Sequence, residues 1–479
     1  MESTAMKAFI EDAWSSQVMP ALMSYMAIPC ESPAFDPQWQ TNGYMDQAVD
    51  LMVDWSREQL ATMVGVTIEV VRLGGRTPVI FIEVPGDARV PVLVYGHLDK
   101  QPPMEGWSHG RSAWVPSLEG DRLYGRGGAD DGYALFSAIT ALRAVHAQGI
   151  VLPRCTILIE ACEESGSEDL PAYVAHLAER IGTPALVVAL DAGCGNYDQL
   201  WLTTSLRGQV AGTLTVRVLD EGIHSGDGSG VVPSSFRVAR QLLSRLECED
   251  SGEVTEAFHA PIPEPSRLQA ERAARALGTA FYAPLPLAHG VRPVSEQVAE
   301  LILNRAWRPQ LAVIGIDGLP ATAQAAAVTQ PATSLKIGLR LPPTVDPLAA
   351  TETLKTLLET DPPYGAHVVF QPHLQSKGWL APAPSPWLER SVEEASMAAF
   401  GSPPASIGGG GGIPFLSMLG ERFPQAQFVV TGVLGPQSNA HGPNEFLHVP
   451  TAIRVTLAMA VLLRDAQRHA ASPATATST

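Results

Sequence analysis

The chain has 479 residues, of which 46% are hydrophobic and 17% charged, with 42 glycines and 40 prolines. Its 49 acidic and 32 basic residues give a formal net charge of −17, which argues against nucleic-acid binding because that function needs a basic surface. This length predicts two domains, or one large domain with an insertion.

The cysteine content and the N-terminus indicate the cellular compartment. The five cysteines are odd in number and show no C-x-x-C spacing, which argues against a zinc ribbon or a disulfide framework and favours a reducing compartment. The N-terminus lacks a basic region followed by an apolar core. No run of about 18 apolar residues predicts a membrane span. We therefore expect a cytoplasmic protein without membrane partners.

Residues 1–205 alternate predicted helices with predicted strands. Apolar residues at helical spacing predict a helix over residues 1–28, and Pro29 ends it. We then predict strands at residues 66–71, 79–84, 92–95, 156–160 and 185–190, and helices at residues 132–147 and 168–180. This alternation is typical of an α/β fold with a mostly parallel sheet covered by helices.

A different pattern begins after about residue 205. Residues 212–218 and 334–341 alternate between apolar and polar side chains, which is typical of antiparallel strands with one face in solvent. Candidate helices lie between them at residues 234–246 and 296–304. We predict a smaller α+β domain here, over residues 206–385.

The α/β pattern returns near Trp387. It consists of a helix to Phe400, a glycine-rich loop at residues 408–412, a strand at 427–431 and a helix from Thr451. We therefore predict that residues 1–205 and 386–479 form one domain, which the smaller domain interrupts. Residues 471–479 are predicted to form a disordered tail.

The most informative segment is V-L-V-Y-G-H-L-D-K, residues 92–100. Ligands bind at the carboxyl ends of strands in open α/β sheets, and this strand ends at His97 and Asp99. Alternation along an extended chain places both side chains on one side. One of them can then bind a metal while the other orients it.

Three further residues are candidates for the same edge of the sheet. Asp130 precedes a predicted helix in a glycine-rich turn, and it either caps the helix or lies near His97 and bridges two cations. Asp191 follows the strand at 185–190, as an Asx turn or as another ligand. His441 follows the last predicted strand, as a loop histidine or as a ligand.

Glu163 and Glu164 follow the predicted strand at residues 156–160. They form either a solvated acidic loop or a pair in which one binds metal and the other accepts a proton from water. Together, the strand ends offer two histidines, three acids and one spare glutamate. A nitrogen and oxygen ligand set without sulfur suits a pair of zinc, manganese or cobalt ions.

Other residues have less specific signals. His224, in I-H-S-G, is either a surface histidine or functional, and Arg340 lies on the polar face of a predicted strand. The run Gly408–Gly412 is either a flexible linker or a backbone segment that approaches a ligand closely. The chain lacks the phosphate-loop pattern and the G-x-S-x-G elbow of serine hydrolases.

Several motifs together suggest a family. They are Y-G-H-L-D, L-Y-G-R-G-G-A-D-D, E-E-S-G-S-E, S-L-R-G, I-H-S-G, G-G-I-P and A-H-G-P-N-E. In these motifs and their order the chain resembles the co-catalytic zinc exopeptidases, which include carnosinase-type dipeptidases, glutamate carboxypeptidase, aminoacylase and succinyl-diaminopimelate desuccinylase. E-E-S-G-S-E and S-L-R-G are most similar to the carnosinase and cytosolic dipeptidase branch.

The resemblance implies a ligand set for two divalent ions per chain, expected to be zinc, with manganese or cobalt as alternatives. His97 and Asp191 would hold one ion, Glu164 and His441 the other, and Asp130 would bridge them. It also implies that the inserted domain serves as a lid and mediates homodimerisation.

The resemblance further implies roles in catalysis and substrate binding. Glu163 would be the general base and Asp99 would steady His97. His224 would reach the site of a neighbouring subunit and polarise the scissile carbonyl, and Arg340 would bind the substrate carboxylate. Gly412 stands where the family often has Ser or Thr before Ile-Pro, so a hydroxyl contact to substrate is absent there.

These expectations lead to a functional hypothesis and two alternatives. The hypothesis is metal-dependent hydrolysis of dipeptides or short peptides with a free C-terminal carboxylate. The first alternative is hydrolysis of N-acyl amino acids at the same site, as in aminoacylases. The second is a non-catalytic binding protein of the same fold, against which the presence of Glu163 and all five ligands argues.

Overall fold

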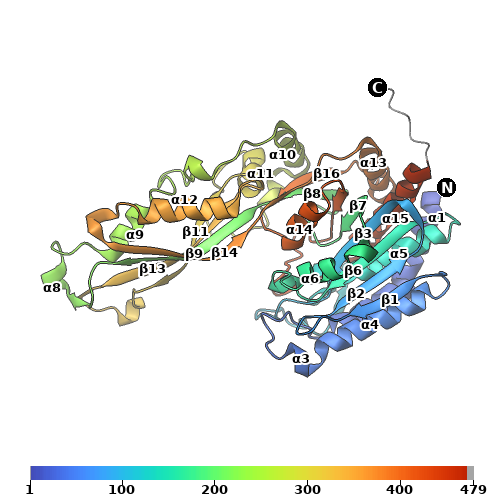
Figure 1. Cartoon of the computed structure of the whole chain (residues 1–479), viewed down its shortest axis with the longest axis horizontal. Coiled ribbons are helices and arrows are strands. Elements are labelled where there is room, and N and C mark those ends of the chain that lie inside the picture. Colours follow the sequence, from blue (N-terminus) through green and yellow to red (C-terminus); the bar gives the residue numbers. More distant parts are fainter. Residues whose placement is uncertain (1, 472–479) are drawn as a thin grey trace.

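The computed structural model describes residues 2–471, so most of the predicted tail lies outside the described residues. The larger part of the molecule is built on a six-stranded sheet (Figure 1). Its strands, in spatial order, are β1 (Thr67–Val71), β2 (Val79–Val84), β6 (Pro153–Glu160), β3 (Asp87–His97), β7 (Leu186–Ala189) and β17 (Gln427–Val430). The last four are mutually parallel, and β2 is antiparallel to both of its neighbours, β1 and β6. The predicted mostly parallel sheet is confirmed.

Helices cover both faces of this sheet. One face packs against α1 (Glu2–Ala13), α2 (Met19–Met26), α4 (Tyr44–Leu60), α5 (Tyr133–His146) and α15 (Val449–Ala471), with α3 (Trp39–Asn42) beside α4 and α13 (Pro386–Phe400) against α15. The other face packs against α6 (Leu170–His176), α7 (Ala178–Ile181) and α14 (Pro414–Arg422).

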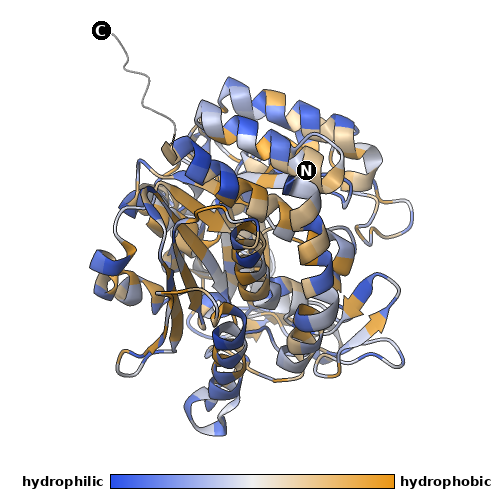
Figure 2. Ribbon diagram, turned by 90° about the vertical axis from the view of Figure 1, so that its right-hand side faces the viewer, coloured by the Kyte–Doolittle hydropathy of each residue, from blue (hydrophilic) through white to orange (hydrophobic). Residues whose placement is uncertain are grey.

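The pleat of β3 divides its side chains between two cores. Val92 and Val94 belong to one core, whereas Leu93 and Tyr95 belong to the other. Figure 2 shows apolar strands enclosed by helices whose outward faces are largely hydrophilic. A strand buried on both faces must be apolar throughout, so its polar residues lie at its ends.

The smaller part contains a four-stranded antiparallel sheet in the order β11 (Gln310–Asp317), β13 (Ala332–Leu341), β9 (Gly208–Arg217) and β14 (His367–Ser376). Helices α9 (Ser235–Leu243) and α12 (Pro347–Glu359) cover one face, where alternate residues of β9 and β13 are buried. At one end lie β10 (Ile223–His224), α8 (Ser225–Gly228) and β12 (Val328–Thr329). This α+β arrangement confirms the predicted fold class.

A three-stranded sheet joins the two parts. It consists of β15 (Trp379–Leu380), β8 (Trp201–Leu206) and β16 (Ala405–Gly409). Helices α10 (Glu264–Leu277) and α11 (Val298–Ala306) pack against β16 and Trp201 and form a separate core there. These helices lie within the predicted insertion but pack on strands outside it, so the limits 206–385 stay a prediction.

Two local predictions differ from the structure. The helix predicted at 168–180 is divided into α6 and α7, because Leu177 between them leaves helical geometry. The predicted glycine loop begins as strand β16, which includes Gly408 and Gly409. A Cβ atom on Gly408 would lie 2.5 Å from the Ala306 Cβ atom, so glycine allows the strand to contact α11 closely.

A small sheet of β4 (Ser117–Glu119), β5 (Arg122–Tyr124) and β18 (Phe446–His448) completes the larger part. Between residues 2 and 471, none of the helices has both the length and the apolar character needed to cross a membrane.

Candidate metal centre

The carboxyl ends of β6, β3 and β7 meet at one edge of the six-stranded sheet. His97 is the last residue of β3, and Asp191 comes shortly after β7. Glu163 and Glu164 lie in a short 3-10 helix just beyond β6. The parallel pairing of these strands brings residues that are distant in sequence to one place.

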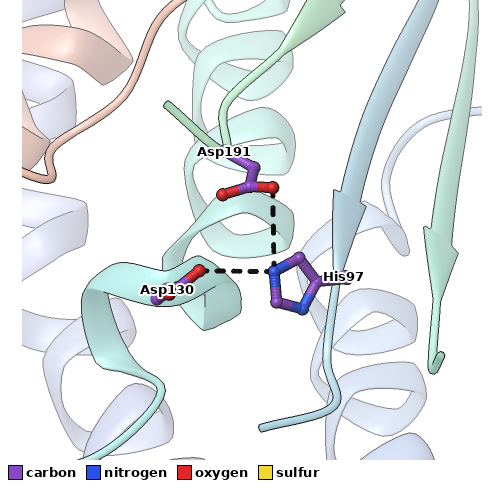
Figure 3. A group of neighbouring side chains, drawn as sticks. All are labelled: His97, Asp130 and Asp191. Atoms are coloured by element: carbon purple, nitrogen blue, oxygen red, sulfur yellow. Dashed lines mark ion pairs between the residues drawn. The ribbon is translucent and has the colours of Figure 1, made fainter. Parts of the chain in front are cut away.

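The first candidate ligand group consists of His97, Asp130 and Asp191, whose side chains are buried. His97 Nε2 lies 3.4 Å from Asp130 Oδ1 and 3.9 Å from Asp191 Oδ2 (Figure 3). Within residues 2–471 this buried nitrogen has no hydrogen-bond partner. An unsatisfied imidazole nitrogen between two carboxylates suits a divalent cation.

The second group consists of Asp130, Glu164 and His441, so Asp130 belongs to both. His441 Nε2 lies 2.9 Å from Asp130 Oδ2 and 3.4 Å from Glu164 Oε2. In each group the candidate ligand atoms lie within 4.8 Å of one another. All donors are imidazole nitrogens or carboxylate oxygens, so the residues fit a pair of divalent ions of the zinc or manganese type.

Asp99 is fully buried and contacts residues of both groups. His97 Nδ1 lies 3.1 Å from the backbone carbonyl oxygen of Asp99 and 3.5 Å from its Oδ1 atom. The two carboxylate oxygens of Asp99 also accept the backbone N–H groups of Glu163, at 3.1 Å, and Glu164, at 3.0 Å. The sequence suggested only the contact with His97. In the structure this one carboxylate lies beside the histidine ring and accepts two hydrogen bonds from the turn that carries both glutamates.

A buried ion pair fastens the loop that carries His441 to the turn that carries Asp130. Arg126 donates to Glu445 and to the Gly442 carbonyl, the latter at 3.1 Å. Glu445 also accepts the N–H of Gly127 at 3.0 Å. Sequence reasoning assigned no role to Arg126 or Glu445, because nothing local shows that residues so far apart form a pair.

Two more polar contacts were not anticipated. Gln101 Nε2 donates to Glu164 Oε2 at 2.6 Å, and the backbone N–H of His97 donates to Asp131 Oδ2 at 3.3 Å. Both residues adjoin recognised motifs: Gln101 continues the alternation that begins at His97, and Asp131 follows Asp130. That adjacency is the only signal in the sequence for either role.

The crowded carboxylates have shifted pKa values. Burial, and next the charge of Asp191, raise the pKa of Glu163 well above its usual range. Burial, and next Asp130, raise the pKa of Glu164 to about 8, and burial raises the pKa of Asp191 to about 6. Asp130 is also buried, but interactions with its two histidine neighbours hold its pKa below the usual range. Divalent cations neutralise such concentrated negative charge.

An open pocket of about 660 Å³ lies over these residues. Its walls include Asp130, Glu163, Glu164, Asp191 and His441, together with Arg340 of β13 and Gly412. Arg340 is half-buried, and burial lowers the pKa of its guanidinium. Among residues 2–471 no carboxylate forms an ion pair with it. A cation is therefore available in the same pocket as the acidic groups.

His224 does not lie in this pocket. It is exposed beside α8, at the end of the four-stranded sheet remote from the larger part (Figure 1). Its Nδ1 atom accepts the N–H of Gly226 at 3.1 Å. Within one chain His224 is thus remote from the metal-ligand groups, and its role across subunits stays a prediction.

Comparison with known proteins points to one family. The model of peptidase family M20/M25/M40 matches residues 93–465. A cysteinylglycine-S-conjugate dipeptidase of Corynebacterium striatum is 24% identical over 383 residues, which cover 77% of this chain and 80% of that protein. The match agrees with the resemblance inferred from the motifs.

Solved structures share the fold. Human carnosine dipeptidase 1 superimposes with a TM-score of 0.74 at 22% identity, covering 98% of this chain and 99% of that one. The metallo-carboxypeptidase Sso-CP2 of Sulfolobus solfataricus gives a TM-score of 0.75 at 19% identity, covering 94% and 99%. Both parts of the molecule therefore have counterparts in these structures.

Proposed function

This chain belongs to peptidase family M20/M25/M40, and we propose that it hydrolyses dipeptides or short peptides with a free C-terminal carboxylate at a dinuclear metal site. The observation that carries this proposal is the pair of ligand groups sharing Asp130, next to a pocket that Arg340 also lines and in which its guanidinium has no ion pair with a carboxylate of residues 2–471. The dipeptidase relative and the carnosine dipeptidase fold support dipeptides as the first substrates to test.

In the proposed site, His97 and Asp191 would hold one ion, Glu164 and His441 would hold the other, and Asp130, which belongs to both candidate groups, would be a ligand to each. Zinc is the proposed metal, with manganese or cobalt as alternatives, because the donors are nitrogen and carboxylate oxygen. When bound, such ions act as Lewis acids towards a carbonyl and lower the pKa of water.

Glu163 is the proposed general base. It lines the pocket beside Glu164 but belongs to neither ligand group, so its carboxylate is free to take a proton from the attacking water. It then delivers the proton to the leaving amine. The Asp99 hydrogen bond to the Glu163 backbone holds this residue in position.

Arg340 is proposed to bind the substrate carboxylate, since a guanidinium pairs with a carboxylate through two parallel hydrogen bonds. Gly412, near it on the pocket wall, leaves space but offers no side-chain donor. His224 of a neighbouring subunit would complete the site by stabilising the developing oxyanion.

That role requires a homodimer through the inserted domain. On the edge strand β11, the apolar side chains of Val313 and Ile316 are each 48% exposed. An exposed apolar edge strand offers a surface for pairing with another chain. Light scattering tests this directly, and a fully active monomer would remove the role of His224.

The experiment that tests the function measures amine release by metal-stripped protein reloaded with zinc or manganese. Substrates are Ala-Ala and matched N-acetyl amino acids, and Glu163→Gln is assayed in parallel. We expect metal-dependent cleavage of Ala-Ala, and a loss of about 100- to 10,000-fold in kcat for the variant with its metal content unchanged.

Preference for the acetylated set would assign the protein to the aminoacylase-type reaction instead. Near-wild-type turnover by Glu163→Gln would exclude Glu163 as the base. Failure to cleave either set would refute both proposed reactions.

A further inference from the structure

A second cavity, of about 430 Å³, adjoins the catalytic pocket. The two share wall residues in four segments: Ala192 and Gly193 just after Asp191, Leu206 at the end of β8, Ile413, and Leu434. None of the predicted site residues lines this second cavity. It is therefore a separate space that opens beside the catalytic pocket.

The walls of this cavity are mostly apolar. They come from Leu277 at the end of α10, from Phe281 and Leu285 just after it, and from Ile407 of β16. Leu285 is 58% exposed, although it is a large apolar residue. An apolar wall next to a hydrolytic site suits the stem of a substrate side chain.

One cation, Arg305 of α11, stands in this apolar wall. Its guanidinium lies 4.4 Å from the centre of the Phe281 ring. The residue as a whole is exposed, but burial lowers the pKa of the guanidinium to about 10. Across residues 2–471, no carboxylate pairs with it. By contrast Arg308, on the same segment, is paired with Glu300 at 2.7 Å and with Asn304 at 2.6 Å.

The surroundings of Arg305 are electropositive. Arg207 lies near both Arg305 and Arg340, and it donates to the backbone carbonyls of Gly410, Asn304 and Arg308 rather than to an acid. Burial, and next the charges of Arg340 and Arg305, lower the pKa of Arg207 to about 10. In a chain with 49 acids and 32 bases, these three neighbouring guanidiniums have no acidic partner among the described residues.

We propose that this cavity is a specificity subsite for a substrate side chain with an apolar stem and a terminal carboxylate, and that Arg305 is its counter-ion. The stem would lie against Leu277, Phe281 and Ile407. This inference rests on the proposed function, in which Arg340 binds the C-terminal carboxylate. It adds a second anion site for the side chain, so the enzyme would favour acidic peptides.

The glycine run explains how Arg305 comes to this place. A Cβ atom on Gly410 would lie 2.9 Å from Arg305 Cγ, and one on Gly408 would lie 2.5 Å from the Ala306 Cβ atom. Side chains at these positions would push α11 away from β16. The glycines thus allow the arginine stem to lie against the strand and its guanidinium to line the cavity.

The test compares peptides that differ only in charge. Wild-type protein and Arg305→Met are assayed with Ala-Glu against Ala-Gln, and with Glu-Ala against Gln-Ala. We expect the wild type to prefer glutamate at one of the two positions by about tenfold or more in kcat/KM, the effect of a charge-assisted hydrogen bond. Arg305→Met should bring that ratio close to one.

Two further variants serve as controls. Arg308→Met removes a neighbouring but already paired arginine and should leave the glutamate-to-glutamine ratio unchanged. Ala280→Trp fills the cavity from its rim without removing the charge, and should reduce kcat/KM for the preferred glutamate peptide more than for Ala-Ala. A ratio close to one in the wild type at both positions, or a preference that survives Arg305→Met, would overturn the proposal.

Measuring peptide binding to the Glu163→Gln variant separates this inference from the proposed function. Calorimetry with Ala-Glu and Ala-Gln, with and without Arg305→Met, should show tighter binding of the acidic peptide at the same position only when Arg305 is present. If wild-type protein cleaved no peptide, the proposed function would fail, and the binding measurements would still decide whether Arg305 recognises a carboxylate.

Discussion

Helices cover both faces of the six-stranded sheet, whereas they cover only one face of the four-stranded sheet. In the central strand β3 of the first sheet, charged side chains are confined to the strand ends, and candidate metal ligands lie at or just after the carboxyl ends of β3, β6 and β7. In the second, polar residues recur on the uncovered face of β9 and β13. Arg340 lines the catalytic pocket, and Lys336, four residues earlier on the same face, is exposed to solvent.

This difference between the two sheets determines how strongly a polar residue in the sequence indicates a functional site. Burying a charged group is costly unless it is paired, so an acid or histidine directly after a buried strand needs a reason to be there. On a half-solvated sheet a charged residue is ordinary. The first sheet therefore shows its functional residues in the sequence, and the second does not.

The largest expected effect comes from the residue shared by both ligand groups. Asp130→Asn should remove a ligand from each group and so lower the content of both metals, with a fall in turnover of at least about a thousandfold, because bound metals contribute several kcal/mol. Elemental analysis and peptide hydrolysis measure this. Glu168→Gln, an exposed acid near the same edge, should retain both metals, and loss of only one metal in Asp130→Asn would contradict the bridging role.

Asp99 is predicted not to bind metal itself, so its substitution tests how much the contacts around the ligands contribute to metal affinity and activity. Asp99→Asn should weaken metal affinity or activity by about 10- to 100-fold, because it loses charge next to His97 and weakens the acceptors for the Glu163 and Glu164 N–H groups. Metal titration with a competing chelator measures the affinity. An unchanged affinity together with unchanged kcat would show that the contact is only structural.

The four-stranded sheet offers a matched pair of variants, Arg340→Met and Lys336→Met. Arg340→Met should reduce kcat/KM for Ala-Ala by about 10- to 100-fold, mainly through KM, because the substrate carboxylate loses a charge-assisted partner. Lys336→Met, on the same strand and face, should have little effect. Equal losses of kcat/KM in both variants would mean that the overall positive charge of the sheet, and not a specific contact with Arg340, attracts the substrate.

The smallest effect concerns a buried charge beside the six-stranded sheet. Lys100 is fully buried and donates to the carbonyls of Tyr25, at 2.9 Å, and Ile28, at 2.8 Å. Burial lowers its pKa to about 8. Because this pKa lies below the unfolded value, the unfolded chain binds more protons above pH 8, and the free energy of unfolding should rise as the pH increases towards 10.

Between pH 8 and 9 the expected rise from Lys100 is about 1 kcal/mol. Urea denaturation of the wild type and of Lys100→Met at each pH isolates this contribution, since other groups titrate in both proteins. A difference between the two proteins that stays constant with pH would show that Lys100 has the same pKa in both states.

The residues at the strand ends of the larger part could be named before the structure was known, because local patterns carry the necessary information. Period-two and period-3.6 apolar patterns indicated the strands and helices, and polar residues after a buried strand indicated His97, Asp99, Glu163, Glu164 and Asp191. The family resemblance supplied their expected roles. The parallel order of the strands then followed from the alternation of helices and strands.

Contacts between distant segments required the tertiary structure. The pairing of Arg126 with Glu445, the double use of Asp99, and the packing of α11 on the glycines of β16 join residues with no relation in sequence. The same holds for the cavity around Arg305, whose walls come from α10, α11 and β16. Local sequence specifies elements and their buried faces through short-range sterics and hydrophobic periodicity, whereas only packing decides which segments lie opposite one another and which charges remain unpaired.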